Sequence, residues 1–129
     1  MVCLDSDVLI NFLRNDPNTV KLIQNLRSKG NKLSITSINS FELLKGIPSY
    51  SNFEKINIIK FLNNFNIYNF ELNSSKKAAE IFENLKTKGE MIDLADIMIA
   101  SIVITKNERL ITNNLKHFEK IKDLIIEEF

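Results

Sequence analysis

Short apolar runs alternate with stretches of helical periodicity along this chain, and this alternation constrains the fold more than any other feature. The runs have the length of buried strands, and they are Val2 to Leu4, Leu33 to Ile35, Ile67 to Phe70, Leu110 to Ile111 and Leu124 to Ile126. The stretches between them carry apolar residues three or four positions apart, which is typical of amphipathic helices. We therefore predict an α/β fold with a central, mainly parallel sheet of about five short strands flanked by helices.

Capping residues give the expected ends of the helices. Asp16 and Pro17 suit the start of a helix that Gly30 ends. Ser37 is predicted to cap a helix that stops at Gly46. The further helices are expected over residues 7–13, over 51–63, from Ser74 or Ser75 to about Gly89, and over 93–105.

The size and charge of the chain limit the classes of protein it can belong to. A length of 129 residues predicts one domain, residues 1–129, that folds without disulfides. With 17 basic and 16 acidic residues, the net charge of +1 is not that of a protein that holds nucleic acid by charge alone. If the substrate is RNA, local basic residues or a metal ion must supply the electrostatic attraction.

The N-terminal segment and the single cysteine indicate a cytoplasmic protein. Cys3 has no partner for a disulfide and lies in an apolar stretch, which suits packing in a reducing compartment. Asp5 follows too early for the apolar region of a signal peptide. The longest apolar run, residues 97–104, is far shorter than the roughly 20 residues of a membrane span.

Several carboxylates stand in apolar surroundings, where a charge is costly unless it is paired or bound to a cation. Asp5 ends the first predicted strand, and Glu42 lies within a short apolar helix. Asp93 and Asp96 are three residues apart, so they share one face of a helix. If these groups converge at the carboxyl ends of the strands, they repel one another, and the simplest remedy is a divalent cation such as Mg²⁺, which prefers oxygen ligands. Such an ion can activate water for attack on a phosphodiester.

Four segments together resemble the PIN-domain family, and within it the VapC-type toxins of toxin–antitoxin pairs. They are LDSDVLINFLR at residues 4–14, FELLKG at 41–46, DLADIMIAS at 93–101 and LITNNLKHFEKI at 110–121. The resemblance implies a three-layer sandwich and metal-dependent cleavage of RNA, with Mg²⁺ or Mn²⁺ as cofactor. It also implies a small cognate antitoxin and a homodimer as assemblies, with no membrane association.

By this resemblance, Asp5, Glu42 and Asp96 form an acidic catalytic triad that binds the metal. Asn114 occupies a position where many relatives have a fourth Asp, which leaves open whether one or two metal ions bind. Asp93 has two interpretations, as a further metal ligand on the face of Asp96 or as the N-cap of the helix.

The same resemblance gives Ser6 and Thr112 supporting roles through their hydroxyl groups. Arg14 closes the first motif and is the preferred candidate for a contact with substrate phosphate. His117, the only histidine, is interpreted as a packing or surface residue. Asp7 is interpreted as structural, because a negative charge in the first turn of a helix is favourable.

Two alternatives to the nuclease stay open. The sequence Asp5-Ser6-Asp7 is also similar to the nucleophile motif of haloacid-dehalogenase-like phosphatases, with Asp5 as nucleophile and Asp7 as acid and base. The second alternative is an inactive PIN-like binding module. Asn114 leaves this alternative open, because it stands where many relatives have an Asp.

Overall fold

A computed structural model of the chain describes residues 1–49 and 51–129, and it contains a five-stranded sheet of order β3-β2-β1-β4-β5. Every pair of neighbouring strands is parallel. The strands are β1 (Val2–Leu4), β2 (Leu33–Thr36), β3 (Asn66–Tyr68), β4 (Arg109–Thr112) and β5 (Ile125–Glu128). The predicted α/β fold is confirmed, although the third and fifth strands are shifted by one or two residues from their predicted ranges.

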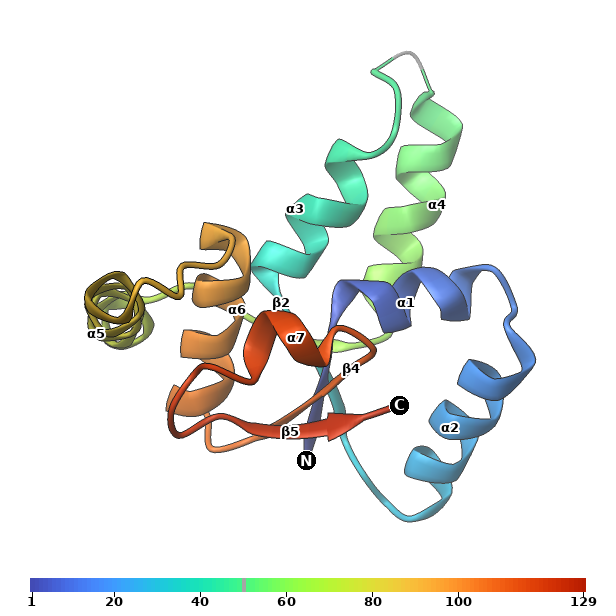
Figure 1. Cartoon of the computed structure of the whole chain (residues 1–129). Coiled ribbons are helices and arrows are strands. Elements are labelled where there is room, and N and C mark those ends of the chain that lie inside the picture. Colours follow the sequence, from blue (N-terminus) through green and yellow to red (C-terminus); the bar gives the residue numbers. More distant parts are fainter. Residues whose placement is uncertain (50) are drawn as a thin grey trace.

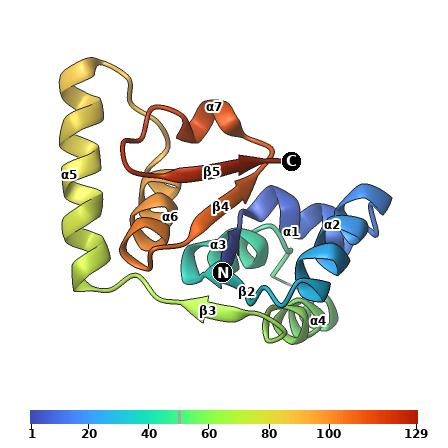
Figure 2. The same cartoon turned by 90° about the horizontal axis from the view of Figure 1, so that it is seen from below.

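Helices cover both faces of this sheet, so the molecule has three layers (Figures 1 and 2). The helices are α1 (Ser6–Leu13), α2 (Pro17–Ser28), α3 (Ser37–Lys45), α4 (Asn52–Leu62), α5 (Leu72–Lys88), α6 (Leu94–Thr105) and α7 (Leu115–Phe118). Helices α5 and α6 lie on one side of the sheet and α1 and α2 on the other, while α3 and α4 extend away from it (Figure 1). In the described part of the chain, no helix is long and apolar enough to cross a membrane.

Alternating side chains of the strands build a separate apolar core on each face. On one face, Leu4 and Ile111 of neighbouring strands pack in a cluster with Leu9 of α1 and Ile23 of α2. On the other face, Cys3 lies in the cluster that α5, α6 and α7 cover. Burial raises the pKa of the Cys3 thiol, so this residue is a packing group.

Two predicted helix starts are wrong, because residues just before them satisfy the first backbone N–H groups. Thr36, not Ser37, caps α3, in a capping box with Asn39. Helix α5 begins at Leu72 rather than at Ser74, because Glu71 is its N-cap and Ser74 bonds back to the backbone of Glu71. Gly89 ends α5 in the left-handed conformation with φ +67°, as its position predicts.

The topology places the ends of β1 and β4 side by side. Leu4 pairs with Ile111, and the Asp5 N–H donates to the Ile111 carbonyl at 3.0 Å. Asp5, which follows β1, and Thr112, the last residue of β4, therefore meet at the carboxyl edge of the sheet, where α/β proteins bind ligands.

Candidate active site

Asp5 is held by hydrogen bonds to both of its carboxylate oxygens. The Ser6 N–H donates to Oδ1 at 2.8 Å, so Asp5 caps α1 as its position after a strand allows. The Thr112 hydroxyl donates to Oδ2 at 2.8 Å and accepts from the Asn114 N–H at 2.9 Å. Asp5 is only 4% exposed and Thr112 is fully buried. The carboxylate orientation is therefore fixed by the end of β4.

Glu42 is tied to the start of α1 through Ser6. The Ser6 hydroxyl donates to Glu42 Oε1 at 2.7 Å and accepts from Asn39 Nδ2 at 2.9 Å. The Asn39 side-chain oxygen in turn accepts from the Thr36 hydroxyl at 2.7 Å. This chain of polar contacts links the end of β2 to Glu42 on α3. Asn39 was not among the site residues predicted from the sequence, although the Thr three residues before it fits the pattern of a capping box.

Asp96 lies in the first turn of α6 and pairs with the only histidine. His117 Nδ1 lies 2.9 Å from Asp96 Oδ2, while the imidazole is half exposed. The imidazole is exposed, as expected for a surface residue, but its contact with Asp96 was not predicted. The two residues are 21 positions apart in the sequence, and no spacing pattern signals the pair.

The carboxylates of the site lie close enough to affect one another's protonation. Burial, followed by the charge of Asp7, raises the pKa of Asp5 to about 7, and Asp96 adds to this rise. Burial also raises the pKa of Asp96, as do the charges of Glu42 and Asp93, while the hydrogen bond and charge of His117 lower it. An excess of negative charge therefore gathers at this edge of the sheet.

Asp7 lies in the first turn of α1, and Asp93 lies at the start of α6. Asp7 accepts hydrogen bonds from the N–H groups of Val8 at 2.7 Å and Asn113 at 2.9 Å, so it holds the loop after β4. Burial raises the Asp7 pKa, and these bonds oppose the rise. Asp93 is the exposed N-cap residue of α6 without a capping bond from its side chain, and its charge reaches Asp96.

The side chains of Asn114 and Arg14 form no hydrogen bond or ion pair with the carboxylates among the described residues. Asn114 precedes α7, is exposed, and contacts the site through its backbone N–H to Thr112. Arg14 is the exposed C-cap residue of α1, and Asp5 caps the opposite end of this eight-residue helix, which is about 12 Å long. A contact between Arg14 and substrate stays a prediction.

The donor set fits a hard divalent cation. Buried carboxylates whose pKa is raised by burial and by neighbouring negative charge favour a bound cation. Among the described residues, no group of three or more Asp, Glu, His or Cys side chains is placed to hold a metal ion by itself. Mg²⁺ keeps several waters and is often bound through one or two carboxylates, so Asp5 and Asp96 with water suffice for this fit.

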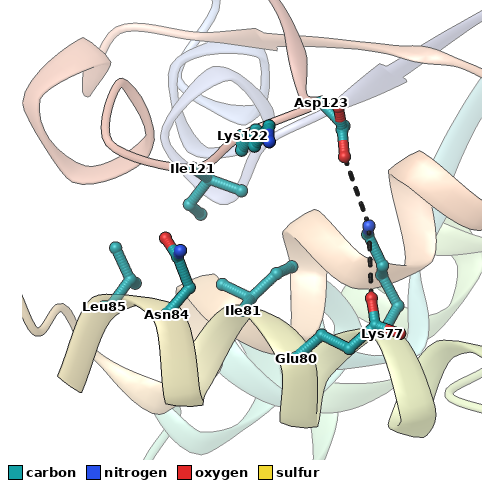
Figure 3. A pocket seen from close by; sticks show the side chains of 8 residues that line it. All are labelled: Lys77, Glu80, Ile81, Asn84, Leu85, Ile121, Lys122 and Asp123. Carbon is teal, nitrogen blue, oxygen red and sulfur yellow. Dashed lines mark hydrogen bonds and ion pairs between the residues drawn. The ribbon is translucent and has the colours of Figure 1, made fainter. Parts of the chain in front are cut away.

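Two hollows flank the site on the side of α7. One, of about 220 Å³, is lined by Asp93, Lys116 and His117 together with Met91 and Ile92. The other, of about 300 Å³, shares Lys116 and His117 and extends to Asn113 and Glu128. A further pocket of about 230 Å³ lies between α5 and residues 121–123, and none of its lining residues belongs to the acidic site (Figure 3).

Comparison with known proteins relates this arrangement to a family. The model of the PIN domain matches residues 2–124. The chain belongs to the PIN-domain family. As a PIN domain it is 31% identical to Ribonuclease VapC2 of Rickettsia felis, over 98% of the chain and 96% of that protein. It is 25% identical to the tRNA(fMet)-specific endonuclease VapC of Salmonella typhimurium, over 98% of the chain and 96% of that protein.

A solved structure agrees with the PIN-domain assignment along the entire chain. The crystal structure of VapBC2 from Rickettsia felis bound to a DNA fragment from their promoter matches with a TM-score of 0.89 and 28% identity. The match covers 100% of this chain and 99% of that one. The predicted family and PIN-like fold are confirmed, and the haloacid-dehalogenase-like alternative is not favoured.

Proposed function

We propose that this PIN-domain protein is a metal-dependent endoribonuclease that hydrolyses RNA phosphodiester bonds, the toxin of a VapBC-type toxin–antitoxin pair. The observation that carries the proposal is the pair of buried carboxylates, Asp5 and Asp96, at the carboxyl edge of the sheet. Their mutual repulsion makes the site selective for a divalent cation and unsuited to an anionic ligand without one. The names of the relatives, ribonuclease and endonuclease VapC, support the same activity.

In this proposal Asp5, Glu42 and Asp96 are the catalytic carboxylates. Asp5 and Asp96 are the first ligands of Mg²⁺ or Mn²⁺, with Glu42 and Asp93 as further ones. When bound, the ion supplies an activated water and neutralises charge on the leaving oxygen. Thr112 fixes the direction of the Asp5 oxygens. Ser6 does the same for Glu42, and Asn114 holds the Thr112 hydroxyl in place through its backbone.

The RNA strand is single-stranded or looped, because an edge site needs an accessible phosphate. Lys116 lines both hollows beside the carboxylates and can contact phosphate there.

A small antitoxin and a second copy of the chain are the proposed protein partners. The solved relatives are VapBC complexes, which supports a cognate antitoxin. Large apolar side chains of α3 and α4 are exposed, among them Phe41, Phe53, Ile56 and Ile59. Such a group of exposed apolar side chains marks a protein interaction surface, so these helices are the surface on which we expect a partner.

Cleavage of a mixed RNA pool by the purified chain, freed of any copurified partner, tests the function. We expect cleavage with Mg²⁺ or Mn²⁺, and loss of cleavage with EDTA and in the Asp96→Asn variant. Glu83→Gln is the matched control, because Glu83 is an exposed carboxylate of α5 outside the site. Cleavage that survives EDTA contradicts the metal. Absence of cleavage by the folded wild type favours an inactive binding module.

A further inference from the structure

An asparagine-rich pocket lies beside the acidic site, between α2 and the ends of β4 and β5. It has a volume of about 680 Å³ and is open to solvent. Eight residues line this asparagine pocket: Asn11 of α1, Asp16 before α2, Asn18, Lys21, Leu22 and Asn25 of α2, Asn113 after β4, and Phe129. In both views the end of β5 points toward α1 and α2 (Figures 1 and 2), so segments from both ends of the chain build it.

The four asparagine side chains of the pocket have no hydrogen-bond partner within the described residues. Asn18, Asn25 and Asn113 are exposed and Asn11 is partly buried. Each amide offers two N–H donors and a carbonyl acceptor. Lys21 is exposed and forms no ion pair with any residue that the structure describes. The pocket therefore presents unused donors and acceptors, the positive charge of Lys21 and the negative charge of Asp16 to a ligand.

The pocket is connected to the acidic site by Asp7 and Asn113. The Asn113 N–H donates to Asp7 Oδ2 at 2.9 Å, and Asn113 also lines the hollow that contains His117. Asn11 follows Asp7 by four residues on α1, so both lie on one face of this helix, about 6 Å apart along its axis. A strand of nucleic acid that crosses the carboxylates can thus continue into the pocket.

We propose that the asparagine pocket binds one nucleotide of the RNA substrate beside the cleaved phosphate and contributes to base preference. This inference rests on the proposed ribonuclease function. An asparagine amide pairs with the edge of a base through one donor and one acceptor. Lys21 contacts the phosphate of the same nucleotide, and the exposed ring of Phe129 offers a face on which the base stacks.

The chemistry of the pocket favours a nucleotide over a segment of a protein partner. The polar lining outnumbers the apolar residues, which are Leu22 and Phe129. An interface for a peptide of a stable complex has an apolar centre, whereas four of the eight residues that line this pocket are asparagines. Asp16 also lines the pocket, but one of its oxygens accepts from the Thr19 N–H and hydroxyl. Its other oxygen is free to accept from the amino group of a base.

The double variant Asn18→Ala/Asn25→Ala tests the pocket, with Gln24→Ala as the matched control. Gln24 is an exposed amide of the same helix that does not line the pocket. We expect the wild type, with Mg²⁺ and an RNA library, to cut with a base preference beside the cut, read by sequencing the cut ends. The double variant should cut with a weaker base preference at the same positions. In the Asp96→Asn background, it should bind intact single-stranded RNA about tenfold or more weakly, measured by fluorescence anisotropy.

The outcomes separate the pocket from the nuclease function itself. If the wild type cuts no RNA, the proposed function fails. If it cuts and the double variant keeps the same preference and affinity, the pocket does not bind a nucleotide. Weaker binding of a copurified protein with an unchanged base pattern would assign the pocket to a protein partner and overturn the inference.

Discussion

The imidazole of His117 lies 2.9 Å from Asp96, and so the only histidine of the chain is bonded to a carboxylate of the proposed site. This contact lowers the pKa of Asp96 against the rise that burial causes. It therefore favours the ionised form of Asp96, and a carboxylate must be ionised to bind a cation. The imidazole is half exposed, so its contribution is screened by solvent.

We predict that His117→Ala raises the pKa of Asp96 and weakens cleavage more at pH 6 than at pH 8. The loss at pH 6 should reach about fivefold, equivalent to the roughly 1 kcal/mol of a half-exposed ion pair. Carbon NMR of the aspartate carboxyl groups measures the titration directly. Lys116→Ala is the control for a change in α7, and an Asp96 titration unchanged by His117→Ala would exclude the role of the imidazole.

Asp5 gives the metal-free protein a stability that depends on pH. Its pKa is raised from an ordinary value near 4 to about 7 in the folded state. Between these values the folded protein holds a proton that the unfolded chain has lost. The contribution of Asp5 to stability is therefore fully present below about pH 4, and it is lost as the pH rises to about 7.

We predict that Asp5→Asn abolishes cleavage and stabilises the metal-free protein at pH 8. The gain is at most about 4 kcal/mol, which corresponds to a shift of about three pKa units. Urea unfolding at pH 5 and pH 8 in EDTA measures it, and the variants should differ less at pH 5. Wild-type stability that does not fall between pH 5 and pH 8 would contradict the raised pKa.

Much of the fold could be predicted from the sequence, because its signals are local. The apolar run Val2 to Leu4 and the polar residue after it gave both the first strand and the position of Asp5. Gly46 and Gly89 marked the ends of helices for the same reason. The start of α5 was misplaced because Ser74 is a good capping residue by type, whereas the structure uses it inside a capping box at the third helical position.

The partners within the site could be predicted less well, because they depend on contacts between distant segments. The bond from Thr112 to Asp5 joins residues 107 positions apart, and only the parallel register of β1 and β4 brings them together. Asn39 and His117 contact site residues through the packing of α3 and α7, and α7 itself was not predicted. The roles of the carboxylates as metal ligands stay predictions.

Thr112→Val should damage the site more than its small change in volume suggests. The hydroxyl is buried, donates to Asp5 and accepts from the Asn114 N–H, so its removal leaves both groups without this partner. We expect a loss of about 1–3 kcal/mol in the free energy of unfolding and a higher Asp5 pKa. Urea unfolding and the pH dependence of cleavage measure these effects. Thr112→Ser, which keeps the hydroxyl, should restore both, and its failure would indicate a packing effect of the methyl group.

We predict that Ser6→Ala lowers activity, because it removes the hydrogen bond that orients the Glu42 carboxylate. The variant removes the donor to Glu42 and the acceptor for the buried Asn39 amide. Loss of a group that orients a metal-binding carboxylate lowers activity about 10- to 100-fold. A double-mutant cycle of cleavage rates with Glu42→Gln tests the coupling. We expect non-additive losses, because both changes disrupt the same contact, and strictly additive losses would mean that Ser6 acts elsewhere.

Asn114→Asp tests how many cations the site accepts. Asn114 is exposed and its N–H donates to the Thr112 hydroxyl that bonds to Asp5, so the variant adds a further negative charge at the same edge of the sheet. We expect Mn²⁺ to bind about 30-fold more tightly, corresponding to about 2 kcal/mol for a carboxylate and a doubly charged cation roughly 4 Å apart in water. The metal-free variant should be less stable than the wild type at pH 8, because the added charge repels Asp5.

Calorimetric titration with Mn²⁺ gives affinity and stoichiometry, with Gln24→Glu as the control for the added charge. Affinity and stoichiometry equal to those of the wild type would place position 114 outside the metal site, and a rise to two ions would show that Asn114 limits it to one.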